Sequence, residues 1–326
     1  MANEKLYTFS SSPHVKAPTT TKGVMINVCI ALLPAIVAGI IFFGLNAFLL
    51  ISLSVFGAVA SEFIYLLIAG KKFKEIAKQF DFTSCVTGIL IGLSIGSQTP
   101  LYVPIFASAF AIIVVKMIFG GTGKNLVNPA IAGRIFAFMS FTTIMAGGWL
   151  APSSGEPITG ATVLTSVLAG ADVSSIPLLD LFLGINLAGC IGETCKLALI
   201  IGGVYLAVRG IINVGYPIIY IAVTGLFTVA LNGFDFAYFL PSILSGGLIL
   251  GAIFMATDYT TSPNTTLGNV IYFIALGLVT AGLREATGIE VVSFVILLLN
   301  LFVPLIDKFV INRPFGFIKQ KKVKGE

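Results

Sequence analysis

Residues 24–69 read VMINVCIALLPAIVAGIIFFGLNAFLLISLSVFGAVASEFIYLLIA, and Glu62 is the single charged side chain among these 46 positions. An apolar helix needs roughly 20 residues to cross a membrane, so this stretch is long enough for two crossings. Similar stretches recur along the chain of 326 residues, of which 57% are hydrophobic and 10% charged. An ordinary soluble domain has about 25% charged residues. The composition therefore excludes a cytosolic enzyme, a secreted disulfide scaffold and a disordered chain, and it predicts an all-α polytopic membrane protein.

The apolar stretches predict about ten transmembrane helices. They cover residues 24–44, 47–69, 83–96, 101–119, 131–148, 181–208, 215–231, 238–257, 269–283 and 291–311. The third and ninth are shorter than the roughly 20 residues of a full crossing. Both contain glycine and run into polar segments, so each is expected to be a partial helix.

Basic residues decide the orientation, because the cytoplasmic loops of membrane proteins carry an excess of Lys and Arg. With the N-terminus in the cytoplasm, 17 of the 19 basic residues fall on the cytoplasmic side. This count includes Lys116, Lys124 and Arg134, which lie around the loop after the fourth span. Arg284 alone falls outside, and Lys196 falls inside the membrane. The distribution favours ten spans with both termini in the cytoplasm.

Ten spans divide into two sets of five, and an odd number per set makes the two sets inverted repeats. The third span (GILIGLSIGSQTP, 88–100) and the eighth (GGLILGAIFMATDYTTSP, 246–263) are both Gly-rich and break into a Ser/Thr-Pro segment. Interrupted helices in inverted repeats build the central site of many transporters. The predicted parts are a cytoplasmic tail, a first repeat, an extracytoplasmic segment, a second repeat and a second tail: residues 1–22, 23–150, 151–180, 181–311 and 312–326.

The extracytoplasmic segment contains PITGATVLT, residues 157–165. Gly160 and Ala161 leave room for a bulky group beside Thr162, and Thr159 is a candidate N-cap for a short helix whose amides would favour a phosphate. A plain capped helix on the outer surface explains the same letters.

The loop after the fourth span reads KMIFGGTGKNLVNPA, residues 116–130. GGTGK lacks the spacing of a phosphate-binding P-loop. Asn125 and Asn128 offer amide donors and acceptors to a planar heterocycle. The alternative is a tight turn with an asparagine that caps the next helix.

Ionisable residues within membrane spans are functional candidates by default. Glu193 and Lys196 lie three residues apart in the predicted sixth span, so they would share one face of a continuous helix. They are either parts of an ion pathway or a structural ion pair that fixes helix packing. Asp258, at the inner break of the eighth span, is a candidate ion or flavin contact, or a cap of that break. Glu62 is expected to extend to the membrane surface, and Asp307 to be an interfacial anchor.

Four cysteines lie at different expected depths, which is a poor arrangement for an iron–sulfur cluster. They are Cys29, Cys85, Cys190 and Cys195. They are interpreted as small apolar packing residues, and no metal site is predicted. His14, in the polar tail, is interpreted as a surface or docking residue.

Several motifs together resemble one family, in the same order and over essentially the whole chain. They are SSPH (11–14), KMIFGGTGKNLVNPAIAGR (116–134), TGAT (159–162), GCIGET (189–194), ATDYTTSP (256–263), and Asn300, Pro304 and Asp307 in the last span. The family comprises the D subunits of the Rnf ion-translocating electron transport complexes and the B subunits of the sodium-pumping NADH:quinone reductases. The short N-terminal tail fits the Rnf branch better.

The resemblance implies ten helices in two inverted repeats, related to urea-transporter folds. It implies FMN attached through its phosphate to Thr162 as a phosphoester, so that the 151–180 segment carries a flavin. It also implies a second, non-covalent flavin, riboflavin, near Asn125 and Asn128. The chain would then be one subunit of a translocase, inactive alone, that couples electron transfer between ferredoxin and NAD to Na⁺ or H⁺ movement. Its expected partners are the other membrane and peripheral subunits, including a second covalent-FMN subunit and iron–sulfur subunits.

Two other functional classes stay open on the sequence alone. A passive channel or secondary transporter of the urea-transporter type would use the same inverted repeats and broken helices. The other class is a structural subunit that only anchors soluble partner proteins at the membrane. The TGAT motif on the outer side separates the classes, because a solute channel has no use for it.

Overall fold

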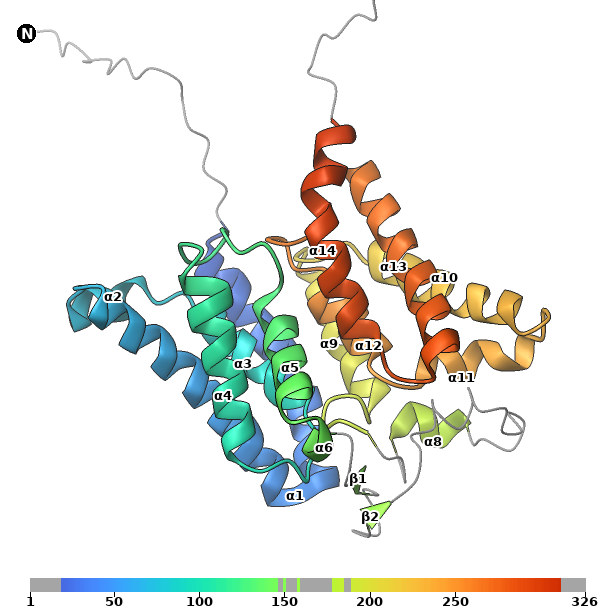
Figure 1. The fold of residues 1–326 in the computed structure, drawn as a ribbon, viewed down its shortest axis with the longest axis horizontal. Helices are drawn as coiled ribbons and strands as arrows, with labels where there is room; N and C mark the ends of the chain where they lie inside the picture. The colour runs from blue at the N-terminus through green and yellow to red at the C-terminus, as the bar shows by residue number, and fades with distance from the viewer. Residues whose placement is uncertain (1–18, 146–148, 151–156, 159–177, 185–188, 312–326) are drawn as a thin grey trace, which may run out of the picture.

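The computed structural model describes residues 19–145, 149–150, 157–158, 178–184 and 189–311. Within these residues the chain is built of helices, apart from one small hairpin (Figure 1). The observed fold agrees with the predicted class of an all-α protein with several apolar helices.

The first helix, α1 (Thr21–Ile68), contains both of the first two predicted spans. Thr20 caps it by accepting a hydrogen bond from the backbone N–H of Gly23. Inside this 48-residue helix Gly44 has φ 68° and ψ −150°, a conformation that is open to a residue without Cβ. The chain changes direction there, so α1 is two helices joined at Gly44, close to the predicted boundary.

The rest of the first half contains α2 (Phe73–Gln79), α3 (Thr83–Leu93), α4 (Tyr102–Phe110) with its π-helical continuation η1 (Ala111–Met117), α5 (Pro129–Ser140) and α6 (Thr142–Met145). Of these, α2, α3, α4 and η1 contact α1, and α5 packs on α3 and α4. The third span is short, as predicted, since α3 has 11 residues. It lies against α1 through two glycines, because a Cβ on Gly88 would lie 2.6 Å from Cα of Val55, and one on Gly92 2.8 Å from Cα of Ile51.

Between the two halves lie three short elements. Strands β1 (Trp149–Leu150) and β2 (Pro157–Ile158) pair antiparallel, Trp149 opposite Ile158, and α8 (Leu178–Leu183) follows. The hairpin was not predicted. It lies at the edge of the molecule opposite to the start of α1 and the end of α14 (Figure 1).

The second half contains a strongly bent span. Its elements are α9 (Lys196–Val208), α10 (Gly215–Leu231), η3 (Phe236–Tyr238), α11 (Phe239–Leu244), α12 (Leu248–Leu250), the π-helical η4 (Gly251–Met255), α13 (Thr266–Thr287) and α14 (Val292–Phe309). The pieces 236–244 and 248–255 meet at 67°, as a broken span or a re-entrant loop. The eighth span ends at Met255, before the predicted polar segment, and it also bends at residues 245–247, which was not predicted.

Two predictions about helix length are wrong. The ninth span is a full-length helix of 22 residues, because Thr265 caps α13 at its start and Gly288, with φ 69°, ends it. The sixth span is not one helix from 181 to 208, since α8 ends at Leu183 and α9 begins at Lys196. Among the described residues α1, α13 and α14 are long and apolar enough to cross a membrane, and the bent pair counts as a fourth. The number of ten crossings stays a prediction.

The two halves are packed side by side (Figure 1). Helix α1 packs against α3 and α4 of its own half and against α9 of the other, while α5 packs against α14. One continuous cluster of buried apolar side chains runs through both halves. The junction between the halves is therefore part of the core, and the polar groups that lie there are buried.

The close approach of α3 to α1 predicts the effect of one methyl group. Gly88→Ala would place Cβ against backbone atoms of Val55 and Ser54, and overpacking of this kind costs about 1–3 kcal/mol. The matched control is Gly282→Ala in α13, where the nearest atom to the new Cβ lies 3.8 Å away. The thermal unfolding midpoint of the purified chain should fall for Gly88→Ala alone. Equal midpoints for both variants would contradict this packing.

Candidate functional site

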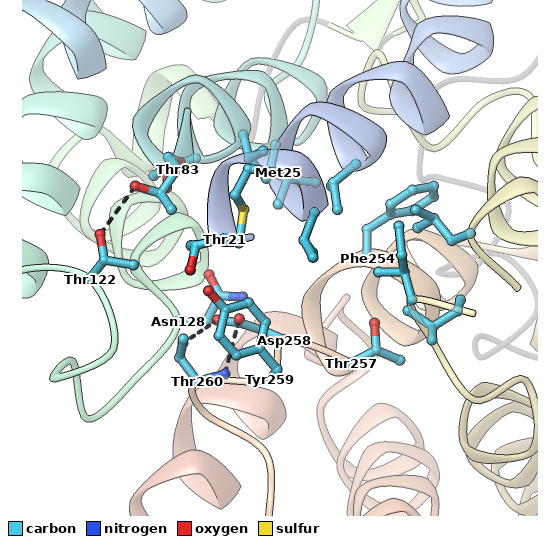
Figure 2. Close-up of a pocket in the computed structure, with 18 of the residues that line it drawn as sticks. Thr21, Met25, Thr83, Thr122, Asn128, Phe254, Thr257, Asp258, Tyr259 and Thr260 are labelled. Atoms are coloured by element: carbon cyan, nitrogen blue, oxygen red, sulfur yellow. Dashed lines mark hydrogen bonds between the residues drawn. The ribbon is translucent and has the colours of Figure 1, made fainter. Parts of the chain in front are cut away.

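A pocket of about 390 Å³ lies between the two halves, at the end of the molecule where α1 begins. Small-molecule sites usually have about 300–1,000 Å³. Figure 2 shows Asn128, Asp258, Tyr259 and Thr260 gathered near Thr21. The apolar wall comes from four helices: Met25 and Val28 of α1, Val86 and Leu90 of α3, Leu206 of α9, and Ile253 and Phe254 of η4.

The loop that follows η4 brings a carboxylate to this pocket. Asp258 accepts hydrogen bonds from the backbone N–H of Thr260 at 3.3 Å and from its hydroxyl at 2.9 Å. Burial raises the pKa of Asp258 above its ordinary value, and the hydrogen bonds from Thr260 and Thr261 oppose that rise. Asp258 therefore lies in the polar loop after the helical part of the eighth span and not at the bend within it, and its side chain both stabilises the loop and lines the pocket.

The two asparagines of the predicted heterocycle site lie on the same wall but differ in what they bind. Asn128 caps α5, since its Oδ1 accepts from the N–H of Ala130, and its Nδ2 donates to the carbonyl of Met255 at 3.1 Å. Asn125 donates through Nδ2 to the carbonyl of Val127 and to Thr260, and its Oδ1 has no donor within the described part of the chain. Asn125 is therefore the one whose acceptor is available to a ligand.

Asn128 is also part of a buried polar connection between the halves. The side-chain amide of Asn300 in α14 is oriented so that both its oxygen and its nitrogen have hydrogen-bond partners. Its oxygen accepts a hydrogen bond from the backbone N–H of Asn128 at 3.2 Å. Its nitrogen donates to the carbonyl of Thr261 and to the hydroxyl of Tyr272. Asn300 is 1% exposed and Tyr272 is fully buried. This connection fixes the loop before α5 against the break after η4.

A buried ion pair lies next to the pocket. Lys116, at the end of η1, is 3% exposed, and its Nζ lies 2.9 Å from a carboxylate oxygen of Glu62. The ammonium also donates to the hydroxyls of Thr83 and Ser84. The expectation that Glu62 extends to the membrane surface is wrong, because its carboxylate is buried beside Lys116. Lys116, the first residue of the predicted loop segment, is buried as the counter-charge of Glu62.

This cluster continues to the loop before α3. Asp81 accepts hydrogen bonds from Thr83 and from the hydroxyl of Thr122 at 2.8 Å. Burial alone would raise the pKa of Asp81, but these hydrogen bonds and the charge of Lys116 together hold it below its ordinary value. A connected row of polar groups therefore leads from the loop surface to Glu62.

A second buried pair replaces the predicted one between Glu193 and Lys196. Glu193 lies in the turn before α9, so it does not share a helix face with Lys196, which is the first residue of α9. The carboxylate of Glu193 lies 3.1 Å from a guanidinium nitrogen of Arg134 in α5. Arg134 also donates to Ser293 of α14, and Lys196 donates to the backbone carbonyl of Glu193. Arg134 is thus a largely buried residue of α5 that joins the two halves.

A third buried ion pair lies against the bent span. Arg284 is 2% exposed and lies 2.8 Å from a carboxylate oxygen of Glu290, with a further bond to the carbonyl of Ser242 in α11. The guanidinium of Arg284 is therefore enclosed between α11, α13 and the start of α14, and its location on the outer side of the membrane stays a prediction.

Sequence reasoning missed Arg134, Lys116, Glu290 and Asn300 as partners of the buried groups. A signal for Arg134 was available. Asn128-Pro129 is a cap followed by a favoured first helical residue, and this places Arg134 in the second turn of an apolar helix. No comparable signal identifies Lys116 or Asn300, whose partners lie dozens of residues away in the sequence. The predicted flavin site at Thr159, Gly160, Ala161 and Thr162 lies outside the described residues.

The observed partner of Glu193 predicts which double variant regains stability. Glu193→Gln leaves the buried guanidinium of Arg134 without its carboxylate, and breaking a buried pair costs roughly 3–5 kcal/mol. Adding Arg134→Met should restore most of the thermal midpoint and yield of the purified chain. Adding Lys196→Met should not. Rescue by Lys196→Met in place of Arg134→Met would contradict the pairing.

Three similar proteins are D subunits of ion-translocating complexes. The one from the Na(+)-translocating ferredoxin:NAD(+) oxidoreductase complex of Acetobacterium woodii is 40% identical over 322 residues, with 98% of each chain covered. The one from the proton-translocating ferredoxin:NAD(+) oxidoreductase complex of Clostridium ljungdahlii is 33% identical, covering 96% of this chain and 97% of the relative. The one from the ion-translocating oxidoreductase complex of Stutzerimonas stutzeri is 31% identical, with 90% and 91% covered.

A family profile matches over nearly the same length. The profile described as the NQR2, RnfD, RnfE family covers residues 8–316, which include both halves and the segment between them. The similarity therefore extends over the whole architecture and is not confined to one motif. The chain belongs to the NQR2, RnfD, RnfE family, as its motifs predicted.

Proposed function

We propose that this chain is the flavin-carrying membrane subunit of a redox-driven ion pump, which couples electron transfer between ferredoxin and NAD⁺ to the movement of Na⁺ or H⁺. The observation that carries this proposal is the end-to-end similarity to subunits whose names state that activity, at 40% identity over 98% of both chains. The subunit acts within its complex, together with further membrane and peripheral subunits, and it is not active alone.

The first proposed cofactor is FMN, attached as a phosphoester to Thr162 in the segment after the β1–β2 hairpin. The motif TGAT at 159–162 supports it, since Gly160 and Ala161 leave room beside the acceptor hydroxyl. Thr162 is a tether in this proposal and takes no part in the redox chemistry. The hairpin lies at the edge opposite to the start of α1, which fits an extracytoplasmic location for this flavin (Figure 1).

The second proposed cofactor is a non-covalent flavin, riboflavin, in the pocket between the halves. The residues fit such a group, because apolar side chains of α1, α3, α9 and η4 surround it and polar groups lie along one edge. Asn125 would bind the heterocycle through its available Oδ1, with Thr257 and Thr260 beside it. Asn128 would act indirectly, by fixing the loop that carries Asn125. The flavin supplies one- and two-electron redox chemistry when bound.

The proposed topology has ten crossings in two inverted sets, with both termini on the cytoplasmic side of the inner membrane. The short α3 and the bent pair α11–α12 are interruptions at corresponding places in the two halves, which supports the repeat. The start of α1 and the end of α14 lie at the same edge of the molecule (Figure 1), which supports a common side for the tails. The two flavins would then occupy opposite faces of the membrane.

The ion pathway is proposed to involve Asp258, while Glu193 and Lys196 are proposed to act first as structure. Asp258 lines the pocket, so an ion or proton that enters there would meet its carboxylate. Glu193 already has a counter-charge in Arg134. The pair would have to separate before Glu193 could hold a transported cation.

Thr162→Ala should abolish covalent flavin while the chain remains folded in the membrane, because the hydroxyl is the attachment atom. In-gel fluorescence after denaturation in SDS measures this, and Thr165→Ala in the same segment is the matched control. Thr159→Ala should weaken the signal without removing it. Fluorescence retained by Thr162→Ala would contradict the attachment site. No fluorescent band from the wild-type chain would favour a passive channel instead.

Asn125→Leu should release the loosely bound flavin and leave the covalent one in place. One or two lost hydrogen bonds to the ligand weaken binding by about 1–3 kcal/mol. Asn128→Leu should also release this flavin, and it should in addition lower the thermal unfolding midpoint, because loss of the N-cap of α5 costs about 0.5–2 kcal/mol. Acid extraction followed by chromatography measures the released flavin. Unchanged extractable flavin in Asn125→Leu would remove this residue from the site.

A further inference from the structure

Helix α2 carries a concentration of positive charge at the edge of the molecule. Lys71 precedes it, and Lys72, Lys74 and Lys78 follow within seven residues, with Glu75 as the one acid among them. All four lysines are exposed, and none takes part in an ion pair within the part of the chain that the structure describes. In Figure 1 α2 lies beside the end of α1, on the side away from the second half.

The two faces of α2 differ in character. Lys74 and Lys78 are four residues apart within α2, so they lie on one side of the helix. Phe73 and Ile76 are three residues apart and lie on the other side. Ile76 is 2% exposed and packs inward, while Phe73 remains 63% exposed. The helix is therefore amphipathic, with an apolar face only partly covered by the protein.

Aromatic contacts fix the orientation of this helix. The ring of Phe63, near the end of α1, lies 5.7 Å from that of Phe73 and 5.8 Å from that of Phe80. Phe80 in turn lies 5.0 Å from Phe82. These rings attach both ends of α2 to the body of the protein, so the basic face is held in place.

The last turns of α1 beside α2 expose apolar side chains. Ile64 is 54% exposed, Leu67 46% and Ile68 83%. In a membrane protein such side chains face lipid tails. Four lysines at the end of a lipid-facing helix are therefore expected at the depth of the lipid headgroups, where a basic cluster attracts anionic lipids.

We propose that α2 and Lys71 form an in-plane anchor that binds anionic phospholipid, with the four lysines on headgroup phosphates and Phe73 inserted among the acyl chains. The amphipathic pattern with a basic polar face is that of interfacial helices. The exposed apolar side chains next to the lysines favour lipid over an acidic soluble protein, because a protein partner would leave Phe73 and Ile68 without an apolar environment. This surface is separate from the flavin pocket, and the proposal does not depend on the proposed function.

The test compares two variants of the full chain at the same four positions. The first replaces Lys71, Lys72, Lys74 and Lys78 with Gln, and the control replaces the same four lysines with Arg, which keeps the positive charge. Native mass spectrometry measures the fraction of chains that carry phosphatidylglycerol, against phosphatidylcholine as the neutral probe. Affinity for phosphatidylglycerol should fall about fivefold for each α2 lysine removed, and it should stay near the wild-type value in the control. Phe73→Ser should weaken binding of both lipids.

Three outcomes overturn the proposal. The first is equal phosphatidylglycerol binding by the fourfold Gln variant and the wild-type chain. The second is displacement of the bound lipid by millimolar inorganic phosphate, which would mean a site for free phosphate. The third is unchanged lipid binding with loss of complex assembly, which would mean a docking surface for an acidic protein of the complex. If the fourfold variant does not fold, Lys71→Gln/Lys72→Gln and Lys74→Gln/Lys78→Gln are measured separately, each with about a 25-fold loss expected.

Discussion

Buried charges are the constraint on which this structure depends, because a membrane interior offers no water to solvate them. Lys116 is held by Glu62, Arg134 by Glu193, and Arg284 by Glu290, at distances of 2.8 to 3.1 Å. Each pair joins elements that are remote in the sequence or on opposite sides of a break. The apolar helices can pack in many ways, but these pairs are satisfied in one arrangement.

The same constraint explains where the pocket forms. The interrupted helices expose backbone groups in the interior, and the protein satisfies them locally with side chains such as Asn128 and Asn300. Asn128 caps α5 and fixes the loop before α5 against η4. The space left between these irregular segments is the pocket, so a cavity of small-molecule size arises where the helices are interrupted.

Sequence periodicity was sufficient for the regular parts of the fold. The predicted span at 215–231 coincides with α10, and the division of residues 24–69 falls at Gly44, where the backbone changes direction. The length of an apolar stretch predicts a helix because it depends only on residues that are neighbours in the sequence. It did not predict α2, which is short and polar on one face, or the break between α8 and α9. The full length of α13 was underestimated, since its capping residues lie among polar neighbours.

The candidate site was predictable in its residue types but not in its pairings. Asn125, Asn128 and Asp258 were identified from local motifs, and the structure brings all three to one pocket. Their separate roles follow from contacts with Met255 and Thr260, more than 120 residues away from the asparagines, which no local pattern encodes.

The central claim is that one chain carries two flavins, one covalent and one loosely bound. The most direct measurement is the mass of the wild-type chain, purified with its complex, first under native and then under denaturing conditions, together with the flavin released between the two. The account predicts a denatured chain heavier by one FMN phosphoester and one equivalent of released riboflavin. A denatured chain of unmodified mass with no released flavin would contradict it.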